Sequence, residues 1–109
     1  MRAVAQVLRA RIKGADIAAR LGGDEFAVLL PDTEIAAATV LAEQIRTTLL
    51  QRRLRLIDRN DYIENVTLSV GVAHAGSDTS LEALLKKADS ALYAAKHAGR
   101  NCVSTEAAN

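Results

Sequence analysis

Two short segments hold the residues whose types and spacing could do chemistry. The first, residues 20–26, reads Arg-Leu-Gly-Gly-Asp-Glu-Phe and places Asp24 and Glu25 directly after Gly22 and Gly23. Adjacent carboxylates supply the hard oxygen ligands that Mg²⁺ prefers, with phosphates and water completing its octahedron. Glycines let a phosphate or a ribose approach the main chain closely. The same pattern is typical of a tight turn with solvated acids, and on the turn alone we favour that simpler interpretation.

The second segment, residues 96–101, reads Lys-His-Ala-Gly-Arg-Asn. Lys96 and Arg100 are four residues apart near the end of an expected helix, so both cations can point to one side. Such cations interact favourably with the negative end of the helix dipole, and in isolation we favour this structural role. The functional alternative is a clamp on a polyphosphate, with the lysine as a point charge and the arginine as a planar fork.

Composition excludes several classes of protein. The chain has 109 residues, a formal net charge of +1, three aromatic residues and one cysteine. Near-neutral charge and few aromatics argue against nucleic-acid binding. No apolar run approaches the length of a membrane span, so we expect no direct membrane contact. A single cysteine cannot form an internal disulfide, which suits a cytoplasmic location. These counts predict one soluble α/β or α+β domain.

Periodicity predicts the elements that must position the two segments. Apolar residues at steps of three and four indicate a helix from Met1 to about Lys13. A period of two on both sides of Gly22-Gly23 indicates a hairpin, and its second strand, apolar on both faces, should lie inside a sheet. Asp32 or Thr33 could cap the next helix, which should end near Gln51. We expect residues 52–64 to be irregular, with a short strand at Leu54–Ile57.

The second half predicts a strand, a helix and a final short strand. Val66–Val72 alternates large apolar residues with small ones, and the small face should let another element approach closely. Thr79 and Glu82 form a capping box for the last helix. Its apolar stripe comprises Leu81, Leu84, Leu85, Ala88, Leu92 and Ala95. Gly99 stands where a glycine commonly follows a helix, and Asn101–Thr105 should be a strand. Alternating strands and helices imply a mixed sheet with helices packed on it.

Four segments in this order resemble the GGDEF family, the diguanylate cyclase domains of bacterial signalling proteins. The resemblance extends over nearly the whole chain, and we interpret residues 1–109 as a single, partial domain of this family. It implies an α/β fold of the palm-like, ferredoxin-like kind. The matching segments are Arg20–Phe26, Leu30–Thr33, Val66–Val72 and Ala88–Lys96 with Gly99–Asn101.

The resemblance implies an activity and roles for the residues above. Two GTP molecules would be condensed into cyclic di-GMP with release of pyrophosphate, one held by each of two facing domains. By position, Asp24 and Glu25 match the acids that handle Mg²⁺ or Mn²⁺, and Asp24 matches the metal ligand itself. Gly22 and Gly23 should line the nucleotide, and Lys96 and Arg100 match the phosphate contacts. A sensor domain linked to the parent protein is also implied.

Two departures from the family pattern modify this expectation. Family members have an upstream strand that carries a further metal-ligating aspartate, followed by Phe-Lys and Asn-Asp residues that help to bind guanine. The chain shows neither, so we expect a truncated fragment that is inactive alone, with strand edges available for pairing in a homodimer. Many relatives also bind product at an Arg-x-x-Asp site. Here the matching residues are Lys13 and Asp16, so weak or absent product binding is predicted.

Two rival functions remain at this point. A degenerate relative could bind GTP or a partner protein without turnover, although intact Asp24 and Glu25 favour the enzyme. A nucleic-acid polymerase palm shares the logic of an acidic hairpin, but the charge and the aromatic count give it little support.

Overall fold

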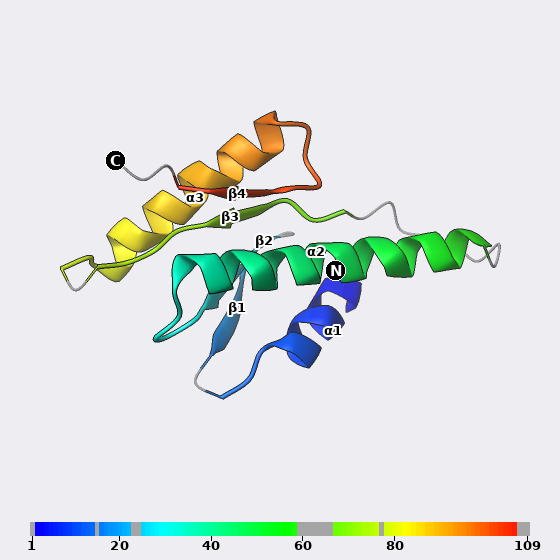
Figure 1. The fold of residues 1–109 in the computed structure, drawn as a ribbon, viewed down its shortest axis with the longest axis horizontal. Coiled ribbons are helices and arrows are strands. Elements are labelled where there is room, and N and C mark those ends of the chain that lie inside the picture. The colour runs from blue at the N-terminus through cyan, green and yellow to red at the C-terminus, as the bar shows by residue number, and fades with distance from the viewer. Residues whose placement is uncertain (1, 15, 23–24, 59–66, 77, 107–109) are drawn as a thin grey trace.

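The computed structural model describes residues 2–14, 16–22, 25–58, 67–76 and 78–106 of the chain. Their elements follow the predicted order of helix, hairpin, helix, strand, helix and strand (Figure 1). The elements are α1 (Arg2–Arg11), β1 (Ile17–Gly22), β2 (Glu25–Leu29), α2 (Ile35–Asp58), β3 (Val70–Val72), α3 (Leu81–His97) and β4 (Val103–Thr105). The mixed α+β class is therefore confirmed.

The predicted hairpin is present as the antiparallel pair β1 and β2. Its ladder runs from Ile17 opposite Leu29 to Arg20 opposite Phe26, and then shifts so that Gly22 lies opposite Glu25. Such an irregularity bends a strand and redirects the side chains that follow it. The shift lies directly beside the turn, at the pair that contains Glu25.

The main hydrophobic core lies between α1 and α2. Val4, Val7 and Leu8 of α1 are buried against Ile45 and Leu49 of α2. Apolar residues spaced by three and four fall on one face of each helix, which is why the two helices bury these side chains together. Phe26 and Val28 of the hairpin pack against the same cluster. The hairpin is thereby fixed to the helix pair.

The strands β3 and β4 form a separate parallel sheet, with Val70 opposite Val103. Helix α3 covers one face of this sheet and α2 lies against the other (Figure 1). The predicted close approach on the small-residue face is confirmed at Gly71, where an added β-carbon would overlap backbone atoms of Leu92 and Ala88. Backbone-to-backbone contact at this point holds α3 close to β3.

The described strands form two two-stranded sheets, one antiparallel and one parallel. The prediction that β2 lies inside a sheet covered on both sides is wrong for this part of the chain. Leu29 is 40% exposed, and its partner Ile17 on β1 is 57% exposed. The helices α1 and α2 cover only one side of the hairpin, so the apolar residues on its other side face solvent in the described structure.

Two expectations about α2 are also wrong. The helix continues to Asp58, so Leu54–Ile57 is helical and is not a strand. Arginine, glutamine and leucine all favour helix, and no glycine or proline interrupts residues 33–58. At the other end the helix begins at Ile35, and the Thr33 hydroxyl donates to the carbonyl of Pro31 and does not cap the helix. Asp32 has a left-handed φ of 53° in the preceding turn.

The predicted capping box and apolar stripe of α3 need correction. Ser80 is the N-cap, and its hydroxyl accepts a hydrogen bond of 3.1 Å from the amide of Ala83. The Thr79 hydroxyl instead accepts from the amide of Gly76 within the preceding loop. Within the predicted stripe, Ala95 is buried and Leu84, Ala88 and Leu92 are half-buried, but Leu81 and Leu85 are exposed. Ala91, outside that stripe, is also buried. The two buried residues are both alanines, as suits the close approach of α3 to β3 at Gly71.

The strand predictions hold over shorter ranges. Within the expected strand Val66–Val72, the structure assigns only Val70–Val72, and Val66 lies outside the described residues. The last strand is Val103–Thr105, because Asn101 belongs to the turn before it. Gly99 has a φ of 112° directly after α3, as its predicted place beyond the helix requires. None of the helices in the described part of the chain combines the length and apolar character needed to cross a membrane.

Candidate functional site

The turn of the β1–β2 hairpin and the last turn of α3 meet through one ion pair. Lys96 Nζ lies 4.0 Å from Glu25 Oε1. The two side chains are 36% and 50% exposed, so solvent screens their attraction and the pair contributes at most about 1 kcal/mol. Because the pair is weak, a more highly charged anion can replace Glu25 as the partner of Lys96, and a cation can replace Lys96 as the partner of Glu25. The structure thus brings together one acid and one cation of the two segments singled out in the sequence.

The remaining residues of the hairpin turn are only partly described. Gly22 ends β1 opposite Glu25 in the ladder. Gly23 and Asp24, the other predicted members of this turn, lie outside the described residues. The roles predicted for all four residues stay predictions.

Arg100 follows α3 in a turn with unusual backbone angles. Gly99, Arg100 and Asn101 have φ values of 112°, 64° and 46°, all in the left-handed region. The amide of Arg100 donates a hydrogen bond of 3.1 Å to the carbonyl of Ala95, which joins the turn to the end of the helix. The side chain of Arg100 is exposed to solvent. Lys96 and Arg100 are therefore carried by one short structural unit, the end of α3 and this turn.

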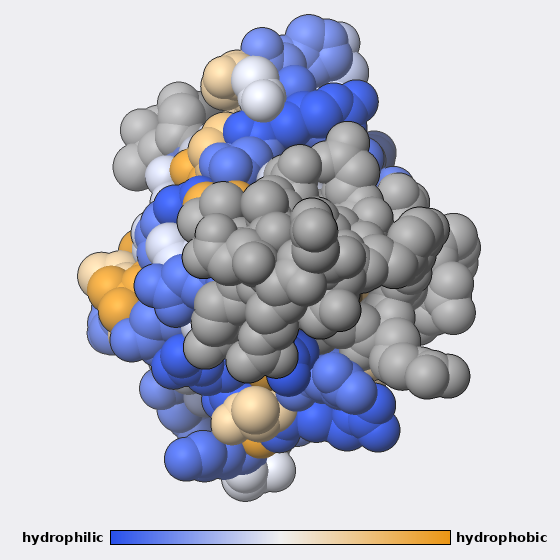
Figure 2. Space-filling view, turned by 90° about the vertical axis from the view of Figure 1, so that its right-hand side faces the viewer, coloured by the Kyte–Doolittle hydropathy of each residue, from blue (hydrophilic) through white to orange (hydrophobic). Residues whose placement is uncertain are grey.

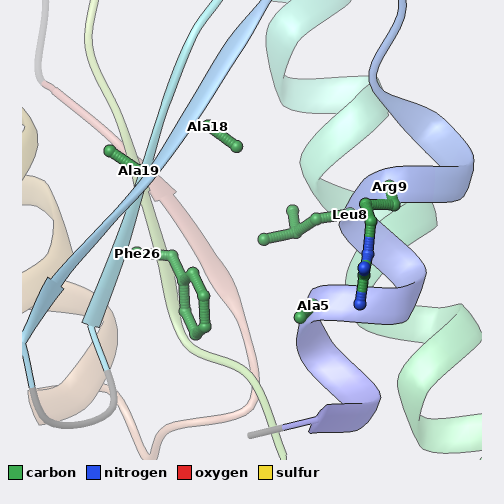
Figure 3. Close-up of a pocket in the computed structure, with 6 residues that line it drawn as sticks. All are labelled: Ala5, Leu8, Arg9, Ala18, Ala19 and Phe26. Carbon is green, nitrogen blue, oxygen red and sulfur yellow. The ribbon is translucent and has the colours of Figure 1, made fainter.

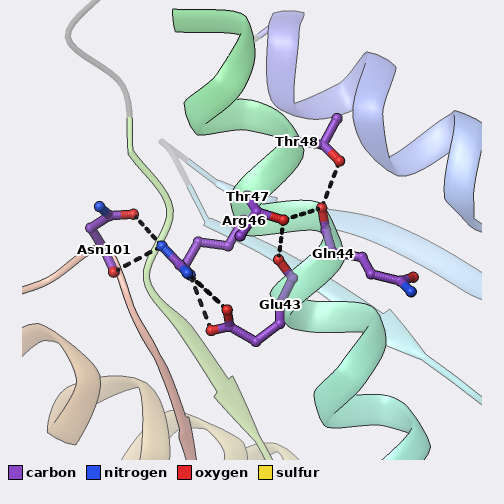
Figure 4. Close-up of polar contacts among 6 residues, drawn as sticks. All are labelled: Glu43, Gln44, Arg46, Thr47, Thr48 and Asn101. Atoms are coloured by element: carbon purple, nitrogen blue, oxygen red, sulfur yellow. Dashed lines mark hydrogen bonds and ion pairs between the residues drawn. The ribbon is translucent and has the colours of Figure 1, made fainter. Parts of the chain in front are cut away.

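A residue that the sequence reasoning missed, Arg46, contacts this turn from α2. Its Nη1 donates to the side-chain Oδ1 of Asn101 at 3.2 Å and to its carbonyl at 3.4 Å, and Nε and Nη2 donate to the Glu43 carboxylate (Figure 4). The hydrogen bond from Arg46 lowers the pKa of Glu43, and the bond to Glu43 raises the pKa of Arg46. In the sequence, Arg46 is one polar residue of a helix that was predicted from its apolar face, so nothing there marked it as part of a site.

The residues of the predicted product site form a tight turn. The amide of Lys13 donates to Asp16 Oδ2 at 3.3 Å, and the amide of Asp16 donates to the carbonyl of Lys13 at 3.2 Å. Gly14, with a φ of 63°, allows the chain to reverse between them. The Lys13 side chain is exposed, while Asp16 is half-buried with its carboxylate turned toward the backbone of its own turn.

Other candidate ligands are engaged elsewhere. The ring of His97 stacks on Tyr93 with centroids 4.0 Å apart, and the thiol of Cys102 donates to the Ala95 carbonyl at 3.3 Å. Among the residues that the structure describes, no three histidine, cysteine, aspartate or glutamate side chains come together to hold a metal ion. A divalent ion at Glu25 would therefore need further oxygen ligands, such as Asp24 and the phosphates of a nucleotide.

A small, mostly apolar pocket lies between α1 and the hairpin (Figure 3). It is lined by Ala5, Leu8, Arg9, Ala18, Ala19 and Phe26. Neither Glu25 nor Lys96 borders it. The candidate site lies instead on the open surface between the hairpin turn and the end of α3. At one end of the molecule, the described surface is mainly hydrophilic, with small separate apolar patches (Figure 2).

Comparison with known proteins defines the class of domain. Residues 1–102 match the family model described as diguanylate cyclase, GGDEF domain. The chain is 40% identical over 109 residues to the response regulator PleD of Caulobacter vibrioides, covering 99% of this chain and 24% of that protein. It is 39% identical over 101 residues to diguanylate cyclase DgcM of Escherichia coli, covering 93% of this chain and 23% of that protein.

Solved structures agree with the sequence comparison. The fold is similar to the GGDEF domain of DgcB from Caulobacter crescentus in complex with c-di-GMP, with a TM-score of 0.86 and 33% identity over 96% of this chain and 61% of that one. The active GGEEF domain of a Vibrio cholerae diguanylate cyclase gives a TM-score of 0.72 and 27% identity, covering 97% and 65%. The chain belongs to the GGDEF domain family. It spans about a quarter of the length of the curated relatives named above.

Proposed function

We propose that the chain is part of a diguanylate cyclase that condenses two GTP molecules into cyclic di-GMP and pyrophosphate. Family membership and the names of its relatives support this activity. The single observation that carries it is the 4.0 Å approach of Lys96 Nζ to Glu25 Oε1, because it joins the acidic hairpin turn to the cations at the end of α3. A nucleoside triphosphate with its divalent ion needs both charges in one place.

The residues at the hairpin turn fit a divalent ion. Glu25 offers a half-exposed carboxylate there, and its pairing with Lys96 is weak enough to be exchanged for an ion. We assign Glu25 and Asp24 to hold Mg²⁺ or Mn²⁺, both of which accept hard oxygen ligands. The bound ion would neutralise the negative charge that develops during phosphoryl transfer. Gly22 and Gly23 would line the nucleotide, since without side chains they leave space beside the main chain.

Lys96 and Arg100 would bind the phosphates. Lysine supplies a compact positive charge and arginine a planar fork that matches phosphate geometry. In the absence of nucleotide, the Glu25 carboxylate compensates the charge of Lys96. Phosphate binding would replace this partner with a more highly charged one, so Lys96 should contribute to nucleotide affinity.

Binding of a fluorescent GTP analogue in the presence of Mg²⁺ tests this proposal. We expect Lys96→Met and Glu25→Gln to weaken binding about tenfold or more, because each removes a charged contact. Lys87→Met is a matched control on the same helix, since Lys87 Nζ also lies 4.0 Å from a glutamate, Glu106. It should change affinity by no more than about twofold. Equal effects of Lys96→Met and Lys87→Met would contradict the proposed site.

We further propose that the 109-residue chain alone does not turn over GTP and acts only with a second domain. In the described structure β2 and β3 belong to different sheets, so each keeps an edge that could pair with another strand. Each domain of a facing pair would present one GTP to the other, so a homodimer is the expected active form.

Magnesium-dependent formation of cyclic di-GMP by the purified chain would refute its inactivity. A single monomeric species in light scattering would count against the dimer. Nucleotide or partner binding without turnover in the longer parent protein would favour a regulatory module instead.

Product feedback through Lys13 and Asp16 should be weak. Lysine keeps the positive charge of the matching family arginine but lacks its planar fork. Calorimetry should therefore show no submicromolar affinity for cyclic di-GMP, and Lys13→Arg should increase the affinity.

We also propose a cytoplasmic location, where GTP is available, and a sensor domain in the parent protein.

A further inference from the structure

The turn after α3 adopts a conformation that its sequence does not favour. Three successive residues, Gly99, Arg100 and Asn101, have left-handed φ values. Glycine adopts this region freely and asparagine tolerates it, but for arginine it is uncommon and costs free energy. Consecutive residues of this kind persist only where surrounding contacts hold them. The contacts of this turn therefore decide where Arg100 is placed.

Three contacts hold the turn on different sides. The amide of Arg100 donates to the Ala95 carbonyl at 3.1 Å, and the amide of Asn101 donates to the Ser69 hydroxyl at 3.2 Å. These two bonds fix its amide groups. Arg46 supplies the third contact and binds both acceptors of Asn101, the carbonyl oxygen and Oδ1 (Figure 4). Among the described residues, Arg46 is the side chain that donates to these two oxygens.

The guanidinium of Arg46 is itself held in place. Glu43, one turn earlier on α2, accepts its Nε at 3.1 Å and its Nη2 at 2.8 Å. The side chain of Arg46 is 17% exposed, so these bonds are partly shielded from water. A charged, two-point contact of this kind is stronger and more directional than a neutral hydrogen bond. Glu43 thus fixes the fork of Arg46 in an orientation that leaves Nη1 aimed at the turn.

We propose that Arg46 is a positioning residue that holds the left-handed turn Gly99–Asn101 and so fixes the backbone of Arg100 at the end of α3, the helix that carries Lys96. Arg46 acts from α2, on the opposite side of β3 and β4 from α3, and its hydrogen bonds in the described structure go to Glu43 and Asn101. The consequence for phosphate binding rests on the proposed function, whereas the consequence for the turn does not.

Amide hydrogen exchange of the 109-residue chain, followed by NMR, tests the effect on the turn directly. We expect Arg46→Ala to accelerate exchange of the Arg100 and Asn101 amides roughly tenfold beyond any change in global stability. The amide of Ala98, bonded to the Ala94 carbonyl just before the turn, should not change in this comparison. Arg52→Ala is the matched control, since Arg52 also lies on α2 and donates to a neighbouring side chain, that of Gln6.

A second substitution separates positioning from general destabilisation. Asn101→Gly places a residue that adopts left-handed φ without a steric cost, so the turn would depend less on Arg46. In the double variant Arg46→Ala, Asn101→Gly, exchange at Arg100 should return most of the way to the wild-type rate. Uniform acceleration across α3 and the turn, or an equal effect of Arg46→Ala with and without Asn101→Gly, would overturn the proposal.

Binding of the GTP analogue with Mg²⁺ gives the functional readout. Arg46→Ala should weaken binding several-fold and the double variant should recover it, while Arg52→Ala should not differ from wild type. If the wild-type chain binds no nucleotide, the proposed function fails for this chain, and amide exchange still decides the role of Arg46. Normal nucleotide affinity in an Arg46→Ala variant with a loosened turn would overturn the link between the turn and phosphate binding.

Discussion

Gly71 of β3 lies so close to Leu92 of α3 that a β-carbon at position 71 would overlap the backbone of the helix. This contact is made by backbone atoms on both sides, so it cannot be relieved by rotating a side chain. It fixes the distance between α3 and the sheet formed by β3 and β4. Leu92 and Lys96 lie on the same helix, so the contact with Gly71 also fixes the distance of Lys96 from the sheet.

Substitution of Gly71 by alanine should therefore destabilise the domain strongly. We expect a loss of about 3 kcal/mol or more in the free energy of unfolding, because overpacking against rigid backbone costs more than overpacking against movable side chains. Urea denaturation measures this loss. Gly76→Ala is the matched control, since the nearest atom to its added β-carbon is Thr79 Oγ1 at 3.8 Å, an ordinary contact. Equal stability of the two variants would show that β3 and α3 are farther apart than described.

Replacement of Gly99 by alanine should act through the backbone alone. An added β-carbon meets no atom within 4 Å, but the φ of 112° is unfavourable for any residue with a side chain. We expect a cost of about 1–2 kcal/mol in thermal unfolding experiments. The turn that carries Arg100 should also loosen, so nucleotide affinity should fall with stability. An unchanged melting temperature would contradict the left-handed conformation at this position.

The assignment of Ser80 as the N-cap of α3 can be tested by two substitutions. Ser80→Ala removes the acceptor for the Ala83 amide and should cost about 1 kcal/mol of stability. Ser80→Asp keeps an acceptor at the same place, and its negative charge suits the N-terminus of a helix, so stability should be retained. If alanine were tolerated as well as aspartate, the cap would not depend on the Ser80 side chain.

The Glu43–Arg46 pair predicts a pH dependence of stability. The pKa of Glu43 is lowered in the folded state, chiefly by its hydrogen bond from Arg46. Its contribution is therefore fully present above the ordinary pKa of an unfolded glutamate, about 4.5, and is lost as pH falls through the lower folded value. The raised pKa of Arg46 has no effect here, because arginine stays protonated throughout this range.

Denaturation curves between pH 3 and pH 7 check this expectation. Wild type should lose more stability on acidification than Glu43→Gln, which has no charge to lose at this position. The difference should be small because the Glu43 side chain is 45% exposed. Glu34→Gln, just before α2, controls for removing an acid near the same helix. Parallel pH profiles for wild type and Glu43→Gln would contradict the prediction.

Local patterns in the sequence determined much of the fold. The two-residue period around Gly22 predicted the hairpin, and apolar residues at steps of three and four predicted the helix α1, where Val4, Val7 and Leu8 are buried. The small residues of the strand before α3 predicted the close approach at Gly71. In each case the pattern reflects interactions between residues a few positions apart or on one face of one element. Such patterns are readable without knowing the topology.

Tertiary structure decided where α3 begins, with its N-cap one residue after the cap that the sequence predicted at Thr79. Thr79 and Ser80 both suit an N-cap, and only the path of the preceding loop assigns the role to Ser80. The N-cap preferences of threonine and serine differ little, so the path of the loop determines which of them caps the helix.

The candidate site itself required the three-dimensional arrangement. The sequence supplied an acid at Glu25 and cations at Lys96 and Arg100, but the contact between Glu25 and Lys96 depends on how the hairpin lies relative to α3. The bond from Arg46 to Asn101 joins residues 55 positions apart, and no periodicity connects them. The sequence by itself thus determined the elements and the chemically able residues. Their convergence was decided by the tertiary structure, because long-range contacts follow from packing of whole elements and leave no local pattern.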